Sequence, residues 1–94
     1  RIIDLRYLIP LDMPQVMAAV GDCEHILIVD ECRQRGSLSE EIMTYLLEHD
    51  SANRPVSRIT ADDSFIPLGR AAYDVLPSAS AIAEKLKALG VVPA

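Results

Sequence analysis

Hydrophobic positions along the chain fall into short apolar runs and into helical periodicities. The most apolar run, residues 25–31, holds four consecutive aliphatic side chains and ends in two carboxylates. Such a run is typical of a strand buried on both faces in a parallel sheet. After it, the spacing of Ser37 and Glu40 matches a helix-capping box and predicts a turn followed by a helix. Ligands of open α/β sheets usually bind at such a loop.

The same patterns predict the other elements. Asp12 is placed to cap a helix, and Gly21 is suited to end it. An apolar stretch at residues 65–69, broken by Pro67, is predicted to be a packed loop rather than a strand. The expected strands are 1–8, 25–31 and 56–60, and the expected helices are 13–20, 38–49, 70–76 and 79–89.

This order of elements predicts the fold class. Strands that alternate with helices favour a three-layer α/β/α, Rossmann-like, mixed and mostly parallel sheet. Residues 1–94 are enough for a single small domain. Three strands make a small sheet, and Arg1 leads directly into strand-like sequence. We therefore expect a fragment of a longer chain that lacks its first strand and helix.

Composition narrows the function classes. With 14 acidic and 9 basic side chains, the formal net charge is −5. This excess argues against a nucleic-acid partner, because phosphates need a basic face, and it favours a basic protein partner. No apolar run approaches the roughly 20 residues that cross a bilayer, so no membrane partner is expected. Cys23 and Cys32 form no CxxC pair, which favours reduced thiols and a cytoplasmic protein.

The order of several short motifs resembles a known family, namely the C-terminal domain of transketolase-like thiamine-diphosphate enzymes. The resemblance is strongest to the beta subunit of the decarboxylating component of 2-oxo acid dehydrogenase complexes, of pyruvate or branched-chain type. A departure is the single Gly36, where relatives often carry a glycine-rich turn. The matching pieces are Ile3-Asp4-Leu5-Arg6, Pro10-Leu11-Asp12, Ile28-Val29-Asp30-Glu31, Gly36 with Glu41-Ile42, Pro55 with Arg58-Ile59, Asp63 with Pro67 and Gly69, and Leu76-Pro77-Ser78 with Ile82.

The resemblance implies a structural and assembly domain of an oxidoreductase. The parent enzyme would carry out oxidative decarboxylation of a 2-oxo acid and transfer the acyl group to lipoyl, using thiamine diphosphate and magnesium. Its catalytic residues and cofactor would lie outside this stretch, which would hold none of them. Implied partners are the alpha and beta subunits of the parent and the basic peripheral subunit-binding domain of the acyltransferase. A transketolase or deoxyxylulose-phosphate synthase type of parent is the alternative within the family.

Two sets of residues are candidates for binding. Asp62 and Asp63, in an acidic turn, are candidates for docking the basic subunit-binding domain through charge complementarity. Arg33, Arg35 and Gly36 precede a predicted helix N-terminus and are candidates for an anion or loop site. Two arginines beside an acidic strand end are more often ion-paired, and one glycine makes no phosphate-cradling loop.

Other chemistries find less support in the sequence. Asp30 and Glu31 could belong to a stand-alone receiver-like regulatory module, but Lys85 and Lys87 are the only lysines and lie in the last predicted helix. Structural carboxylates that bind loop amides or an arginine are the favoured interpretation. The cysteines and histidines lack metal-ligand spacing, so no metal site is expected.

Overall fold

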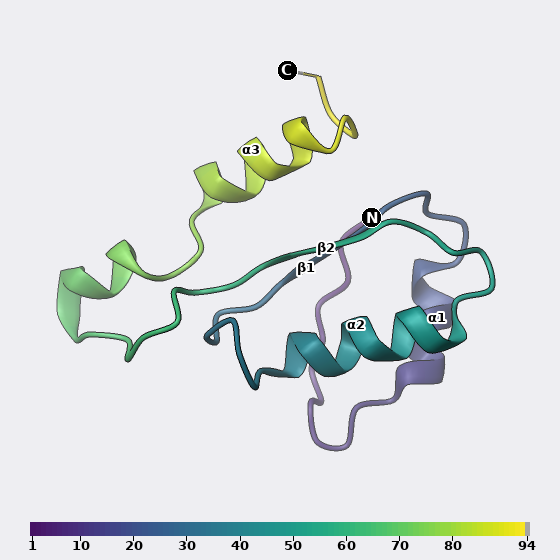
Figure 1. Cartoon of the computed structure of the whole chain (residues 1–94), viewed down its shortest axis with the longest axis horizontal. Helices are drawn as coiled ribbons and strands as arrows, with labels where there is room; N and C mark the ends of the chain where they lie inside the picture. Colours follow the sequence, from purple (N-terminus) through teal and green to yellow (C-terminus); the bar gives the residue numbers. More distant parts are fainter. Residues whose placement is uncertain (94) are drawn as a thin grey trace.

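The computed structural model describes residues 1–93 and shows an α/β chain (Figure 1). Its only sheet in this range has two strands, which are joined by a helix. The α/β class is confirmed, and the sheet has fewer strands than a complete domain of this type. In chain order the elements are α1 (Met13–Val20), β1 (Ile26–Val29), α2 (Leu38–His49), β2 (Val56–Ile59), the 3-10 helix η1 (Gly69–Asp74) and α3 (Ala79–Ala88).

The two strands pair in parallel. Ile26 is opposite Val56, and Val29 is opposite Ile59. The pairing continues past the strand ends, because the Asp30 amide donates to the Ile59 carbonyl at 2.9 Å. The predicted parallel character of the sheet is therefore confirmed for these two strands. It brings the carboxyl ends of both strands, and the loops that leave them, to one end of the sheet.

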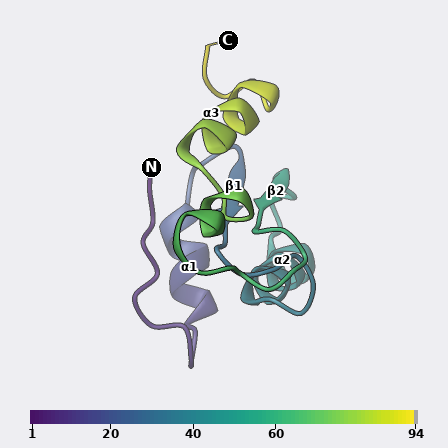
Figure 2. The ribbon, with the colours of Figure 1, turned by 90° about the vertical axis from the view of Figure 1, so that its left-hand side faces the viewer.

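Helices lie on both sides of the strands. Figures 1 and 2 show α1 and α2 on one side and α3 on the other. The core forms where α1 and α2 meet β1, because apolar side chains repeat at helical spacing on the facing sides of both helices. Its buried members are Met13, Val20, Ile26, Ile42 and Leu46. No helix among residues 1–93 is long and apolar enough to span a membrane.

Two predicted features are not found. Residues 1–8 form no strand, although their sequence suits one. A strand needs a hydrogen-bonded neighbour, and this segment runs crosswise to the strands instead of along β1 (Figure 1). The loop at residues 65–69 is not packed either, since Phe65 is 100% and Leu68 95% exposed. No element within residues 1–93 covers them.

An arginine joins the ends of three elements. Arg54 forms an ion pair with Asp50 at 2.9 Å, and both side chains are nearly buried. One guanidinium nitrogen of Arg54 also donates to the carbonyls of Val20 and Gly21, at 3.1 and 2.6 Å. These carbonyls lie at the end of α1, where helix carbonyls have no partner within the helix. Arg54 therefore holds the end of α1 against the turn between α2 and β2.

This contact predicts a specific acid sensitivity. Hydrogen bonding from the Arg54 side chain lowers the pKa of Asp50 to about 2. Because the folded pKa lies below that of an unfolded aspartate, near 3.9, Asp50 stabilises the fold above about pH 4. That contribution is lost as the pH falls toward 2. Asp50→Asn should therefore lower the denaturation midpoint at pH 7 and have much less effect at pH 2.

Glu48→Gln, at an exposed acid on the same helix, is the matched control and should change neither midpoint. An equal loss for Asp50→Asn at both pH values would show that the charge of Asp50 does not stabilise the fold.

Candidate functional site

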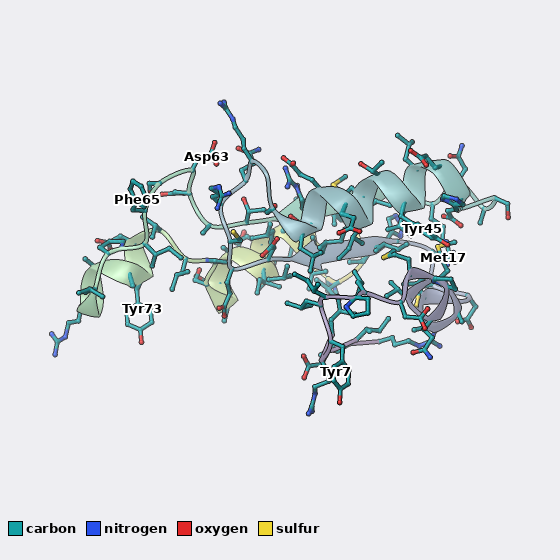
Figure 3. All side chains as sticks on the ribbon, turned by 90° about the horizontal axis from the view of Figure 1, so that it is seen from below. Tyr7, Met17, Tyr45, Asp63, Phe65 and Tyr73 are labelled. Carbon is teal, nitrogen blue, oxygen red and sulfur yellow. The ribbon has the colours of Figure 1, made fainter. Side chains whose placement is uncertain are left out.

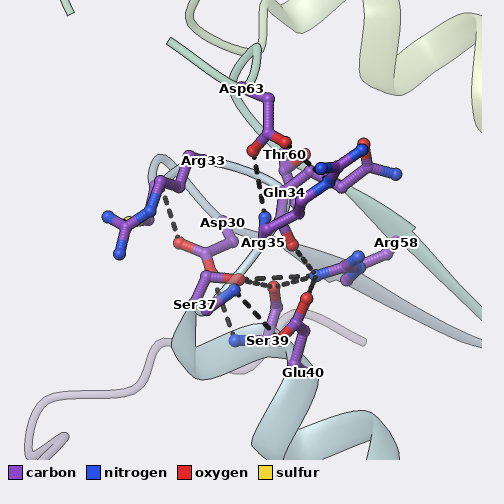
Figure 4. A network of polar contacts seen from close by, with 12 residues as sticks. Asp30, Arg33, Gln34, Arg35, Ser37, Ser39, Glu40, Arg58, Thr60 and Asp63 are labelled. Atoms are coloured by element: carbon purple, nitrogen blue, oxygen red, sulfur yellow. Dashed lines mark hydrogen bonds and ion pairs between the residues drawn. The ribbon is translucent and has the colours of Figure 1, made fainter. Parts of the chain in front are cut away.

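Asp30 lies at the carboxyl end of β1 and binds the loop that follows (Figure 4). Its Oδ1 accepts a hydrogen bond from the Cys32 amide at 2.9 Å. Its Oδ2 accepts one from the Ser39 amide at 3.1 Å, in the first turn of α2. The Asp30 carboxylate thus binds at the N-terminus of α2. There the free amides and the positive end of the helix dipole could otherwise hold a free anion. The interpretation of Asp30 as a structural carboxylate is confirmed.

The charge of Asp30 is stabilised by these contacts. Partial burial alone would raise the pKa of the carboxyl, but hydrogen bonds from Cys32, Ser39 and Ser37 outweigh it and lower the pKa. Asp30 is therefore ionised at neutral pH. A general acid at neutral pH would need a carboxyl group whose pKa is raised rather than lowered.

The predicted capping box does not form as expected. Ser37 is the N-cap residue of α2, but its side chain makes no capping bond. Its hydroxyl instead pairs with the Ser39 hydroxyl at 2.8 Å. Glu40 accepts from the amide of Gly36 rather than that of Ser37. The reason is tertiary, because Asp30 reaches α2 from β1 and takes the Ser39 amide.

Arg58 of β2 completes this cluster. Its guanidinium donates to the Gln34 carbonyl at 2.8 Å and to the Ser39 hydroxyl at 3.0 Å. It also lies 3.9 Å from a Glu40 oxygen, and 17% of its side chain is exposed. The guanidinium of Arg58 also contacts the hydroxyl of Ser37, which lies 21 positions earlier in the sequence. Sequence reasoning assigned Arg58 no role, although an arginine between two aliphatic residues of a predicted strand could have indicated a polar partner.

The predicted binding residues lie beside this cluster, and only some of them meet. Asp63 accepts from the Arg35 amide at 3.1 Å and pairs with its guanidinium at 3.0 Å. The structure thus joins one residue from each predicted set. Arg33 is exposed and donates weakly to the Cys32 sulfur at 3.6 Å. Asp62 is exposed, and its amide donates to the Val75 carbonyl.

This arrangement is suited to holding loops in place. Its carboxylates and guanidinium groups bind one another or the main chain. The Ser37 and Ser39 hydroxyls are buried, and the basic side chain beside them is an arginine rather than a histidine. Nucleophilic catalysis would need an adjacent general base. Within residues 1–93, no three His, Cys, Asp or Glu side chains are grouped closely enough to hold a metal ion.

The fold is that of a small α/β domain, and comparison with family models identifies its family. Residues 1–85 match the family model described as "Transketolase, C-terminal domain". Because the match covers most of the chain, the chain belongs to this family, and the resemblance inferred from the sequence motifs is confirmed. No solved structure matches the chain significantly.

Curated relatives lie in two enzyme classes. The chain is 28% identical over 89 residues to "Pyruvate dehydrogenase E1 component subunit beta" of Staphylococcus epidermidis, covering 93% of this chain and 27% of the relative. The Staphylococcus aureus protein of the same name is 28% identical over 88 residues, covering 92% and 27%. "1-deoxy-D-xylulose-5-phosphate synthase" of Halothermothrix orenii is 26% identical over 68 residues, covering 72% and 11%. The chain thus spans about a quarter or less of these relatives.

The hydrogen bonds of Asp30 predict its effect on stability. Asp30→Ala removes the acceptor for the Cys32 and Ser39 amides and should lower the free energy of unfolding by about 2 kcal/mol. Glu31→Ala, at the exposed neighbouring acid, should change it by less than about 0.5 kcal/mol. Urea denaturation of both variants at pH 7 measures the difference. Equal effects would mean that Asp30 does not join β1 to α2.

Proposed function

We propose that this chain is the C-terminal assembly domain of a thiamine-diphosphate-dependent 2-oxo acid dehydrogenase, as part of its beta-type subunit. The observation that carries the proposal is the similarity to pyruvate dehydrogenase E1 beta subunits over 93% of the chain. The parent would decarboxylate a 2-oxo acid and transfer the acyl group to lipoyl. The domain would contact alpha and beta subunits in the cytoplasm.

The geometry of the loop cluster supports an assembly role better than a catalytic one. Asp30, Arg58 and Asp63 are each occupied by hydrogen bonds or ion pairs within the domain. The residues present do not form a fitting site for the magnesium ion, since no three His, Cys, Asp or Glu side chains are gathered in the described range. We therefore place the cofactor in another part of the parent and assign no reaction step to this domain.

A deoxyxylulose-phosphate synthase parent is the second candidate. The match to the Halothermothrix orenii enzyme supports it, and that match covers 72% of the chain. The similarity to E1 beta subunits covers more of the chain, so the dehydrogenase parent is preferred. A branched-chain dehydrogenase parent belongs to the same proposal.

Within this proposal, the segment after β2 supplies the docking surface. Asp62 is exposed, and four large apolar side chains are exposed in the segment that follows it, namely Phe65, Ile66, Leu68 and Tyr73. Figure 3 shows Asp63, Phe65 and Tyr73 at the same end of the molecule. Acidic and apolar side chains together suit a small basic domain, which would gain charge complementarity at the rim and contact area at the centre. The net charge of −5 favours the same partner.

The parent activity is tested with the intact natural protein and its partner subunits. Incubation with pyruvate or a branched-chain 2-oxo acid, thiamine diphosphate, magnesium and a lipoyl domain should add an acyl group to the lipoyl domain. Mass spectrometry of the lipoyl domain measures this. In the same mixture with glyceraldehyde 3-phosphate added, formation of 1-deoxy-D-xylulose 5-phosphate from pyruvate without lipoyl acylation would contradict the proposal and favour the second candidate.

The docking surface is tested by charge reversal. Asp62→Lys in the intact protein should lower the association rate constant with the acyltransferase's subunit-binding domain about tenfold, because it removes attraction and adds repulsion. Glu48→Lys is the matched control, since it changes the charge equally at an exposed position on α2. Asp63 is the poorer test residue because its replacement would also release Arg35. Stopped-flow rates that are equal for both variants would exclude Asp62 from the interface.

A further inference from the structure

Residues 62–75 form a closed loop beyond the carboxyl end of β2 (Figure 1). The Asp62 amide donates to the Val75 carbonyl at 2.9 Å, so the two ends of the loop meet. Surface loops of about 6 to 16 residues whose ends lie close together often carry a function. Apolar packing does not fix this loop, because its largest side chain, Phe65, is fully exposed. Polar contacts must therefore hold the loop against the domain.

Asp63 makes these contacts (Figure 4). Its Oδ1 accepts a hydrogen bond from the Arg35 amide at 3.1 Å, and its Oδ2 lies 3.0 Å from Arg35 Nε. Within residues 1–93, no other residue of the range 63–74 forms a hydrogen bond or ion pair with residues 1–61. The Arg35 side chain is 86% exposed, and ion pairs in water contribute little. The bond from the Arg35 amide is therefore the main attachment.

The backbone of Arg35 is itself held from both sides. The Gln34 carbonyl accepts from the Arg58 guanidinium at 2.8 Å. The Gly36 amide donates to Glu40 at 3.0 Å. Because Arg58 belongs to β2 and Glu40 to α2, the neighbours of Arg35 are attached to a strand and to a helix. The amide that binds the loop is thus fixed by the rigid part of the domain.

We propose that Asp63 is a positioning residue, which acts through the Arg35 amide to hold loop 62–75 in its binding conformation before the partner arrives. The proposal rests on the docking function proposed above for this segment. It separates the roles of two adjacent acids, since Asp62 faces the charge of the partner and Asp63 orders the loop. A loop that is ordered beforehand loses less conformational entropy on binding, so the complex is tighter.

Two variants at one position separate the hydrogen bond from the charge. Asp63→Ala and Asp63→Asn remove the same negative charge. Asn keeps an oxygen that can accept from the Arg35 amide, and the exposed Arg35 side chain can turn into water. A difference between the two variants therefore reports the positioning of the loop.

Hydrogen exchange of the intact natural protein without the partner tests the positioning. The Asp62 amide, which closes the loop, should exchange about tenfold faster in Asp63→Ala than in the wild type. In Asp63→Asn it should stay within about threefold of the wild-type rate. Slow exchange at Leu46, in the core helix α2, verifies that both variants are folded. Equal exchange rates at Asp62 in the two variants would overturn the proposal.

Binding kinetics with the acyltransferase's subunit-binding domain test the consequence for docking. Both variants should associate at the same rate, because they carry the same charge. Asp63→Ala should dissociate about tenfold faster than Asp63→Asn. Equal dissociation rates would show that Asp63 acts only as a charge, and would overturn the proposal. Absence of binding to the wild type would contradict the docking function alone, because the hydrogen exchange result does not depend on the partner.

Discussion

The parallel pairing of β1 with β2 is the interaction on which the rest of the domain depends. It places both carboxyl ends at one end of the sheet, where the Asp30 and Arg58 side chains meet the first turn of α2. It also leaves one edge of β1 free, because a two-stranded sheet satisfies only half of the backbone groups of each strand. The position of the loop cluster and the free edge of β1 therefore both follow from this pairing.

The charged side chains near the strand ends act mainly on their own chain. Asp30, Arg58 and the Arg35–Asp63 pair connect loops that lie far apart in the sequence. Such contacts hold the exposed groups of the domain in a fixed arrangement, because rigid elements support the loops that carry them. Asp62 and the apolar side chains that follow it are exposed on such a surface.

Local sequence patterns predicted local structure well. The cap at Asp12 and the periodicity of residues 38–49 gave α1 and α2 with accurate bounds, because these signals act within one turn of a helix. The strand predicted at residues 1–8 failed because a strand depends on a partner that can be distant in the sequence. The Ser37 capping box failed because Asp30, from another element, takes the Ser39 amide. The Arg35–Asp63 pair spans 28 positions and could not be inferred without the fold.

We propose that this chain is the C-terminal domain of a longer thiamine-diphosphate enzyme, which other parts of the polypeptide complete. The most direct test is the mass and sequence of the intact natural chain on the N-terminal side of Arg1. The account predicts a strand and a helix immediately before Arg1, and before them a cofactor-facing domain with an activating glutamate. A natural chain that begins at or near Arg1 would contradict it.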